Sequence, residues 1–260
     1  MLQHGINSDA TTWLVDDPSQ SLGFMLADRS FDVWMANNRG SWFSMEHESL
    51  DPKQKEFWAF SLDQMAKFDL PANLALISKI TGFSKIEFIG HSLGNTQMFA
   101  ALSDPTIRPL VAPYIDRFTA LAPAIYFRQN KIRYPNSIFY LTNLVNNVGW
   151  LLNVHYFFSE ECKWDQEAID ADSKRCSENP KKCYYEVEFL DHEPEVDNWA
   201  RYGVWKAQYH WSGSRRTFIH FGQIIRNQIW RPNYFKNTIS ERGGTKRCTE
   251  SQFHPAMTSV

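Results

Sequence analysis

The chain has 260 residues, 43% of them hydrophobic and 22% charged, which is the composition of an ordinary globular domain with room for an inserted subdomain. Its 27 basic and 29 acidic residues give a net charge of −2 without a Lys/Arg stripe, so nothing indicates a nucleic-acid partner. No transmembrane segment is predicted, because the closest candidate, Ile138–Phe158, is interrupted by asparagines and His155.

The opening residues predict the end of a strand at Leu2-Gln3, followed by a loop at His4-Gly5-Ile6. We expect no signal peptide within this sequence, because its opening residues lack the pattern of one. This loop places a glycine beside a free backbone N–H, which is typical of an oxyanion donor near a serine nucleophile. The alternative interpretation of the loop is a plain turn.

Helices and strands alternate along the next part of the chain. Ser19–Asp28 has helical spacing, and Phe31–Met35 is predicted to be a strand. A long helical region is expected over Asp51–Lys79, broken at Pro71. This alternation predicts a parallel α/β sheet with the active groups at the C-terminal ends of the strands.

The most informative stretch contains one serine in a tight turn. A strand is predicted at Lys85–Ile89 and a helix over Gln97–Leu102, and Ser92 lies between them. Gly90 and Gly94 bracket the serine in a G-x-S-x-G pattern, which a nucleophile elbow needs because neighbouring backbone must approach closely. The pattern alone is equally typical of a structural turn, and the flanking strand and helix favour the nucleophile.

The next buried strand is expected within Asp116–Ala124, where a proline stops it. We expect the elbow strand to be central in the sheet. Its neighbours should be the strands around Leu2–Gln3 and Phe118–Leu121, with Phe31–Met35 on the other side of Leu2–Gln3.

Several motifs in register make the chain similar to the acid lipase family of gastric and lysosomal lipases. They are, in chain order, Leu2-Gln3-His4-Gly5, Asp32-Val33-Trp34 with Asn38-Arg39-Gly40, Phe57–Ser61, Asp63–Ala72 and Gly90–Gly94. The resemblance runs from Met1 to about Leu121 and returns at His210–Ser214 and His220–Gln223. One departure is Leu93, where the family usually has glutamine, but a backbone N–H donor does not depend on that side chain.

The resemblance implies an α/β-hydrolase parallel sheet with an inserted, mainly helical cap, here lacking the first and last strands. The implied parts are a core with the elbow (1–122), a cap (123–208), a return segment to the core (209–237) and a diverged, disordered tail (238–260). Ser92 would be the nucleophile that forms an acyl-enzyme, and the N–H groups of Ile6 and Leu93 would bind the oxyanion. The implied substrates are neutral lipid esters, either triacylglycerols or sterol esters, met in transient contact with a lipid droplet or micelle. The implied location is secreted or lysosomal.

The triad Asp and His are not found in the chain. The resemblance places both after the segment that ends at Gln223, and the only histidine beyond it is His254, in a sequence unlike the family's His motif. His254 is therefore the one candidate substitute for the base, and without an activated serine we expect a poor catalyst. Glu241 and Glu250 are the only acidic residues after Gln223. Structural roles are expected for His91, His210 and His220. Asp191-His192 is expected to be a solvated stretch of the cap and not a catalytic pair.

Two classes of function remain open: a carboxylic-ester hydrolase, or a non-catalytic chain, which would be either a catalytically incomplete fragment or a lipid-binding remnant. A thioesterase or acyltransferase on the same fold is a more distant alternative, because an elbow does not choose the acyl acceptor.

Four cysteines leave three full pairings open. Cys162, Cys176 and Cys183 fall in the implied cap, and Cys248 falls in the tail. A disulfide within the cap would suit the implied secretory or lysosomal setting, although the sequence has no N-x-[ST] acceptor to support that setting. Metal binding is the alternative for these cysteines, but no C-x-x-C pair is present and we expect no metal there. No cofactor is expected either.

Overall fold

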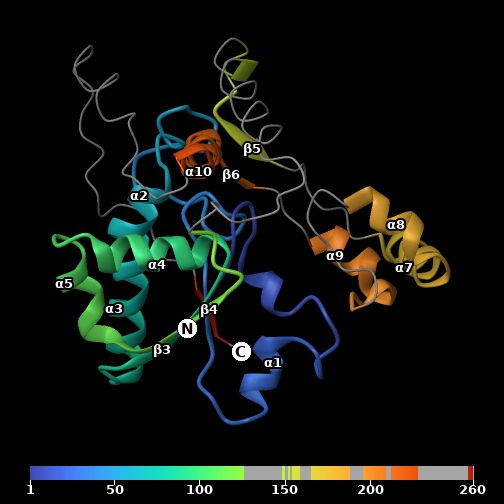
Figure 1. Cartoon of the computed structure of the whole chain (residues 1–260), viewed down its shortest axis with the longest axis horizontal. Coiled ribbons are helices and arrows are strands. Elements are labelled where there is room, and N and C mark those ends of the chain that lie inside the picture. Colours follow the sequence, from blue (N-terminus) through green and yellow to red (C-terminus); the bar gives the residue numbers. More distant parts are fainter. Residues whose placement is uncertain are drawn as a thin grey trace.

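A central sheet organises the N-terminal part of the molecule (Figure 1). The computed structural model describes residues 1–125, 148–149, 152, 154–158, 165–187, 196–208, 212–227 and 257–259. The sheet has the order β4-β3-β1-β2-β7. Its strands are β1 (Leu2–Gln3), β2 (Trp34–Ala36), β3 (Ile86–His91), β4 (Ile115–Leu121) and β7 (Met257–Ser259).

The predicted strand order is confirmed. The elbow strand β3 lies between β1 and β4, and β2 pairs with the other side of β1. These four strands are parallel, with Leu2 opposite both Ile89 and Met35. Although β1 has only two residues, it joins the two halves of the sheet, and both of its residues are buried.

The two edges of the sheet differ from the prediction. We expected β4 to be buried, but it has one neighbouring strand among the described residues and most of its length is exposed, with Leu121 38% accessible. At the other edge, where a disordered tail was expected, β7 pairs antiparallel with β2. The free edge of a strand carries unpaired N–H and C=O groups that any extended segment can satisfy, which explains this pairing.

Helices cover both faces of the sheet because successive side chains of a strand point to opposite faces. Phe88 packs with α3 (Leu70–Thr81) and α4 (Leu93–Ser103) on one face. Ile89 packs against the cluster of η1 (Ala10–Trp13) and α1 (Leu22–Ala27) on the other. Figure 1 shows α1 on the opposite side of the sheet from α3, α4 and α5. The connection to β4 contains α5 (Arg108–Val111) and η3 (Ala112–Tyr114).

The long helical region differs from the prediction at both its start and Pro71. It begins at α2 (Leu62–Gln64), where Ser61 and Gln64 form a capping box, instead of at Asp51. A π-helical turn, η2 (Met65–Asp69), directly precedes α3, and the Leu70 N–H donates to the Met65 carbonyl. Pro71 has no N–H and would crowd a regular helix, but it follows this wider turn near the start of α3, so the helix continues to Thr81.

The described residues of the later chain form a helical group and a small sheet. The helices are α7 (Gln166–Glu178), α8 (Pro180–Val187), η5 (Trp199–Arg201), α9 (Tyr202–Gln208) and α10 (Arg215–Asn227). A disulfide joins Cys176 to Cys183, next to the buried Trp199 and Tyr202. Cys162 and Cys248 lie outside the described residues. The sheet pairs β5 (Tyr156–Phe158) antiparallel with β6 (Ser212–Ser214).

Polar contacts connect the helical group, defined here as α7, α8, η5 and α9, to the loop between η1 and α1. The Arg201 guanidinium donates to the Val15 carbonyl from Nε at 3.1 Å and from Nη2 at 2.9 Å. Trp205 Nε1 donates to Asp16 Oδ1 at 3.1 Å. In the described part of the chain, no helix is both long enough and apolar enough to cross a membrane.

A buried ion pair ties the loop after β2 to the π turn. Nη2 and Nε of Arg39 each lie 2.7 Å from Asp69 Oδ1, and the Arg39 backbone N–H donates to Asp69 Oδ2 at 3.1 Å. Both side chains are only 6% exposed, and the guanidinium carbon lies 6.0 Å and 5.6 Å from the ring centroids of Phe60 and Phe68. The pair therefore links two segments of the core at the C-terminal end of β2.

We predict that Asp69→Asn lowers the free energy of unfolding by about 3–5 kcal/mol, because it leaves the Arg39 charge buried without its counterion. Urea unfolding followed by tryptophan fluorescence measures the change. The matched control is Asp28→Asn, an exposed carboxylate at the end of α1, which should change stability by no more than about 0.5 kcal/mol. Equal effects of the two substitutions would contradict a structural role for the ion pair.

Candidate active site at the β3–α4 turn

Ser92 occupies a strained turn between a strand and a helix. Its backbone has φ 50° and ψ −115°, a conformation that costs energy for a residue with a Cβ. The Ser92 N–H donates to the Leu121 carbonyl at 3.1 Å, and the Ser92 carbonyl accepts from the Asn95 N–H at 3.1 Å. The end of β4 and the first turn of α4 thus hold the serine in this conformation.

The two motif glycines allow backbone segments to pack closely around Ser92. A Cβ on Gly94 would lie 2.7 Å from the Gln3 carbonyl oxygen and 2.8 Å from the His4 carbonyl oxygen, so α4 lies directly against the end of β1. A Cβ on Gly90 would lie 2.5 Å from Asn95 Oδ1. These distances explain why the turn needs glycine at both positions.

The loop after β1 lies beside the serine. A Cβ on Gly5 would lie 3.2 Å from the Cβ of Ser92, which places the predicted oxyanion loop next to the predicted nucleophile. Leu93 is the first residue of α4, where a helix leaves its N–H groups unpaired. Among the described residues, neither the Ile6 nor the Leu93 N–H donates a hydrogen bond, and both residues line a cavity of about 20 Å³.

His4 organises the same loop through both of its ring nitrogens. The Asn38 N–H donates to Nε2 at 3.1 Å, so Nε2 carries no proton. Nδ1 lies 2.8 Å from the Gly5 carbonyl oxygen and must be the protonated nitrogen. Burial lowers the pKa of His4, which keeps the ring neutral. The sequence placed His4 in the loop motif without indicating this role.

His91 precedes the serine and packs against η1. Its ring meets Trp13 edge-on with centroids 6.4 Å apart, and desolvation lowers its pKa. This contact agrees with a packing role for His91 beside the elbow.

The structure brings Ser92 and Leu93 next to the loop of Ile6, and among the described residues none of the predicted triad partners lies beside them. His254, Glu241 and Glu250 lie outside the described residues, and so do His210 and the Asp191-His192 stretch. His220 is fully buried in α10. The roles of the site residues therefore stay predictions.

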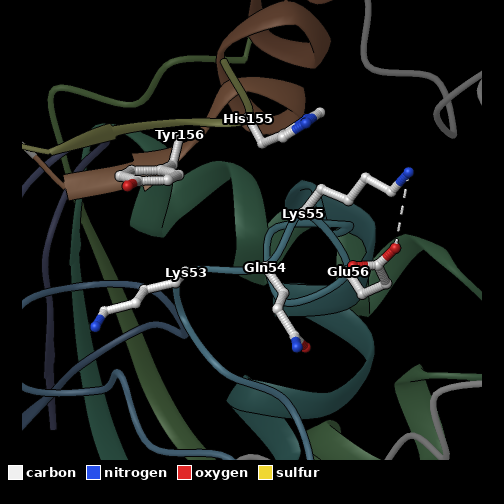
Figure 2. Close-up of a pocket in the computed structure, with 6 residues that line it drawn as sticks. All are labelled: Lys53, Gln54, Lys55, Glu56, His155 and Tyr156. Atoms are coloured by element: carbon white, nitrogen blue, oxygen red, sulfur yellow. Dashed lines mark ion pairs between the residues drawn. The ribbon is translucent and has the colours of Figure 1, made fainter. Parts of the chain in front are cut away.

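A separate depression of about 690 Å³ lies between the loop before α2 and β5 (Figure 2). In Figure 2 the Lys53 and Lys55 side chains point in different directions, and Lys55 Nζ pairs with Glu56 at 3.9 Å. Neither Ser92 nor the two proposed oxyanion donors line this depression, so it does not belong to the elbow. No group of His, Cys, Asp and Glu side chains that could hold a metal occurs in the part of the chain that the structure describes.

No family model matches the chain. The chain is 46% identical to lipase member K of Homo sapiens over 124 residues, which are 48% of this chain and 30% of that protein. It is 47% identical to the lysosomal acid lipase/cholesteryl ester hydrolase of Macaca fascicularis over 124 residues, which are 48% of this chain and 30% of that protein. It is 34% identical to the gastric triacylglycerol lipase of Rattus norvegicus over 233 residues, which are 87% of this chain and 55% of that protein. The chain thus spans at most about half the length of these three relatives.

We predict that Ser92→Gly gives a more stable protein than Ser92→Ala by about 1 kcal/mol. Glycine relieves strain of about 1–3 kcal/mol at this backbone conformation, and its greater freedom in the unfolded chain offsets about 0.5–1 kcal/mol of that gain. The two variants lack the same hydroxyl, so urea unfolding of the pair isolates the backbone effect. A more stable Ser92→Ala variant would show that the turn is not strained.

We predict that His4 is a neutral ring with its proton on Nδ1. A two-dimensional ¹H–¹⁵N spectrum of the imidazoles at pH 6 should show Nδ1 as the protonated nitrogen and Nε2 as the bare one. A proton on Nε2 would contradict the assigned hydrogen bonds.

The lowered pKa of His4 also predicts a pH dependence of stability. As pH falls below the ordinary histidine pKa of about 6.5, the unfolded chain binds a proton that folded His4 resists, so the free energy of unfolding falls. Between pH 7.5 and pH 5 the wild type should lose more stability than His4→Gln. A loss of the same size in both proteins would show that His4 is not the group responsible.

Proposed function

Because the chain is homologous to the acid lipases, we propose that it is a serine hydrolase of carboxylic esters with Ser92 as its nucleophile. The observation that carries this proposal is the position of Ser92 in a strained turn between a parallel strand and a helix, with the Gly5 loop against it. The proposed architecture is an α/β-hydrolase core over residues 1–122, a cap over 123–208 and a return segment over 209–237. The described helices α7 to α9 fall within the cap range.

The proposed reaction uses the backbone as well as the serine. Ser92 Oγ attacks the ester carbonyl, and the N–H groups of Ile6 and Leu93 donate to the oxyanion that develops. Losing one such donor typically costs about 2.7–4 kcal/mol of transition-state stabilisation. The alcohol then leaves with a proton, and water hydrolyses the acyl-enzyme to release the acid and free Ser92. A base is needed to take the hydroxyl proton, and His254 is the one candidate that the sequence offers for it.

The proposed substrates are neutral lipid esters. One relative is named a triacylglycerol lipase and another a cholesteryl ester hydrolase, and these names suggest the two ester classes to test. A lysosomal or secreted location follows from the same homology, and the Cys176–Cys183 disulfide supports an oxidising compartment. Contact with the substrate would be transient, at the surface of a lipid droplet or micelle. The alternative function is a lipid-binding chain without turnover.

We predict that a fluorophosphonate labels the intact chain at Ser92 but slowly, because without a base the hydroxyl is not activated, and fast labelling that His254→Ala abolishes would show that the tail supplies the base. Mass spectrometry of the labelled peptide identifies the site. Ser92→Ala should abolish labelling, whereas Ser103→Ala, an exposed serine at the end of the same helix, should not change it. Absence of the label from Ser92 would contradict the assignment of the nucleophile.

Hydrolysis of a short-chain p-nitrophenyl ester separates the two functions. With an oxyanion hole but no base, turnover should reach about 10³–10⁴-fold over water, the level that remains when triad residues are removed from serine hydrolases. Much faster turnover that His254→Ala abolishes would show that the tail supplies the base. Hydrolysis no faster than in Ser92→Ala would favour the lipid-binding alternative.

A further inference from the structure

The segment Ser212–Thr217, which we call the closing segment, is bonded directly to the loops of the sheet. Ser212 Oγ donates to the Gly40 carbonyl, and Ser214 Oγ donates to the Trp58 carbonyl at 2.7 Å. All three residues of β6 are buried. A Cβ on Gly213 would lie 2.7 Å from Asn7 Oδ1, so this segment packs tightly against the loop after β1.

Two polar atoms near this contact are buried without a hydrogen-bond partner in the described part of the chain. They are Asn38 Oδ1, from the loop after β2, and Thr217 Oγ1, from the first turns of α10. The residues are 2% and 3% exposed. A buried polar atom is ordinarily paired with protein or with an ordered water, so each atom needs a partner.

Both residues line the cavity of about 20 Å³ that also contacts Ile6 and Leu93. A cavity must offer about 10–15 Å³ to hold one water molecule, and that water needs two to four polar partners. The cavity volume is therefore sufficient for one water molecule, and the two unpaired atoms supply the minimum number of polar partners that such a water needs.

We propose that this cavity binds one ordered water molecule, which bridges Asn38 Oδ1 and Thr217 Oγ1. The water donates one hydrogen to the Asn38 oxygen and shares a second hydrogen bond with the Thr217 hydroxyl. No bond other than hydrogen bonds forms or breaks.

The bridge makes Thr217 a positioning residue for the oxyanion loop. The Asn38 N–H donates to His4 Nε2, and His4 Nδ1–H donates to the carbonyl of Gly5, the residue before Ile6. The closing segment is thus connected through the water to the Asn38 side chain, and the Asn38 backbone is connected through His4 to Gly5, the residue preceding a proposed oxyanion donor. This positioning role rests on the proposed function, whereas the water site does not.

A high-resolution crystal structure of the unmodified full chain tests the water site. We expect an ordered water within hydrogen-bond distance of both Asn38 Oδ1 and Thr217 Oγ1. Density without a water at this place, or a protein group in its stead, would overturn the proposal. Because the crystal structure uses the unmodified chain, the test does not depend on whether a variant folds.

Two substitutions at Thr217 test the positioning role. Thr217→Val keeps the shape of the side chain and removes its hydroxyl, and Thr217→Ser keeps the hydroxyl. We expect Thr217→Val to shift the His4 Nδ1–H resonance and to slow fluorophosphonate labelling of Ser92 about tenfold, since small displacements of aligned groups cost rate steeply. Thr217→Ser should stay within about twofold of the wild type and retain its His4 resonance.

The outcomes separate this inference from the proposed function. If Ser92 is not labelled in any protein but the water and the His4 resonance respond to Thr217→Val, the proposed function fails and the bridge stands. If Ser92 is labelled and Thr217→Val matches the wild type in both resonance and labelling rate, the bridge is wrong. A loss of stability alone, without a change at His4, would assign Thr217 a packing role and overturn its positioning role.

Discussion

The candidate site depends on the direct contact between the first turn of α4 and the backbone at the end of β1. Gly94 makes this contact possible, because its absent Cβ would lie 2.7 Å from the Gln3 carbonyl oxygen. The contact places the N-terminus of α4 beside the loop that follows β1. As a result, Ser92 and the Leu93 N–H, which follow β3, and the Ile6 N–H, which follows β1, come just after the C-terminal ends of two strands that are adjacent in the sheet.

The loops around this contact are held by buried polar groups of two kinds. His4 is neutral; it accepts a hydrogen bond from the Asn38 N–H, which connects the two loops, and it donates one to the Gly5 carbonyl within its own loop. Arg39 and Asp69 form a buried ion pair, and the Arg39 guanidinium also lies near the aromatic rings of Phe60 and Phe68. Both devices resist the movement of loops that would otherwise have few regular backbone hydrogen bonds, and a rigid loop is what oxyanion binding requires.

The later chain meets the core in two ways. The closing segment is buried and bonded to core carbonyls, so it is part of the packed structure around the site. The helical group contacts the core through hydrogen bonds such as those from Arg201 and Trp205, while its own disulfide and aromatic cluster hold it together internally. Polar contacts of this kind are typical of interfaces between units that can move relative to one another.

The sequence by itself determined the features that short-range patterns encode. The G-x-S-x-G motif between a strand and a helix located Ser92 in its turn, and the alternation of elements, with the motif resemblance, predicted the order of the four parallel strands. The tertiary structure alone decided the exposure of β4, the pairing of β7 with β2, the helix that continues past Pro71, the tautomer of His4 and the ion pair of Arg39 with Asp69. The physical reason is that the burial, strand pairing and protonation state of a residue depend on neighbours that are distant in the sequence. Asn38 and His4, for example, are 34 residues apart and form their hydrogen bond only when the chain is folded.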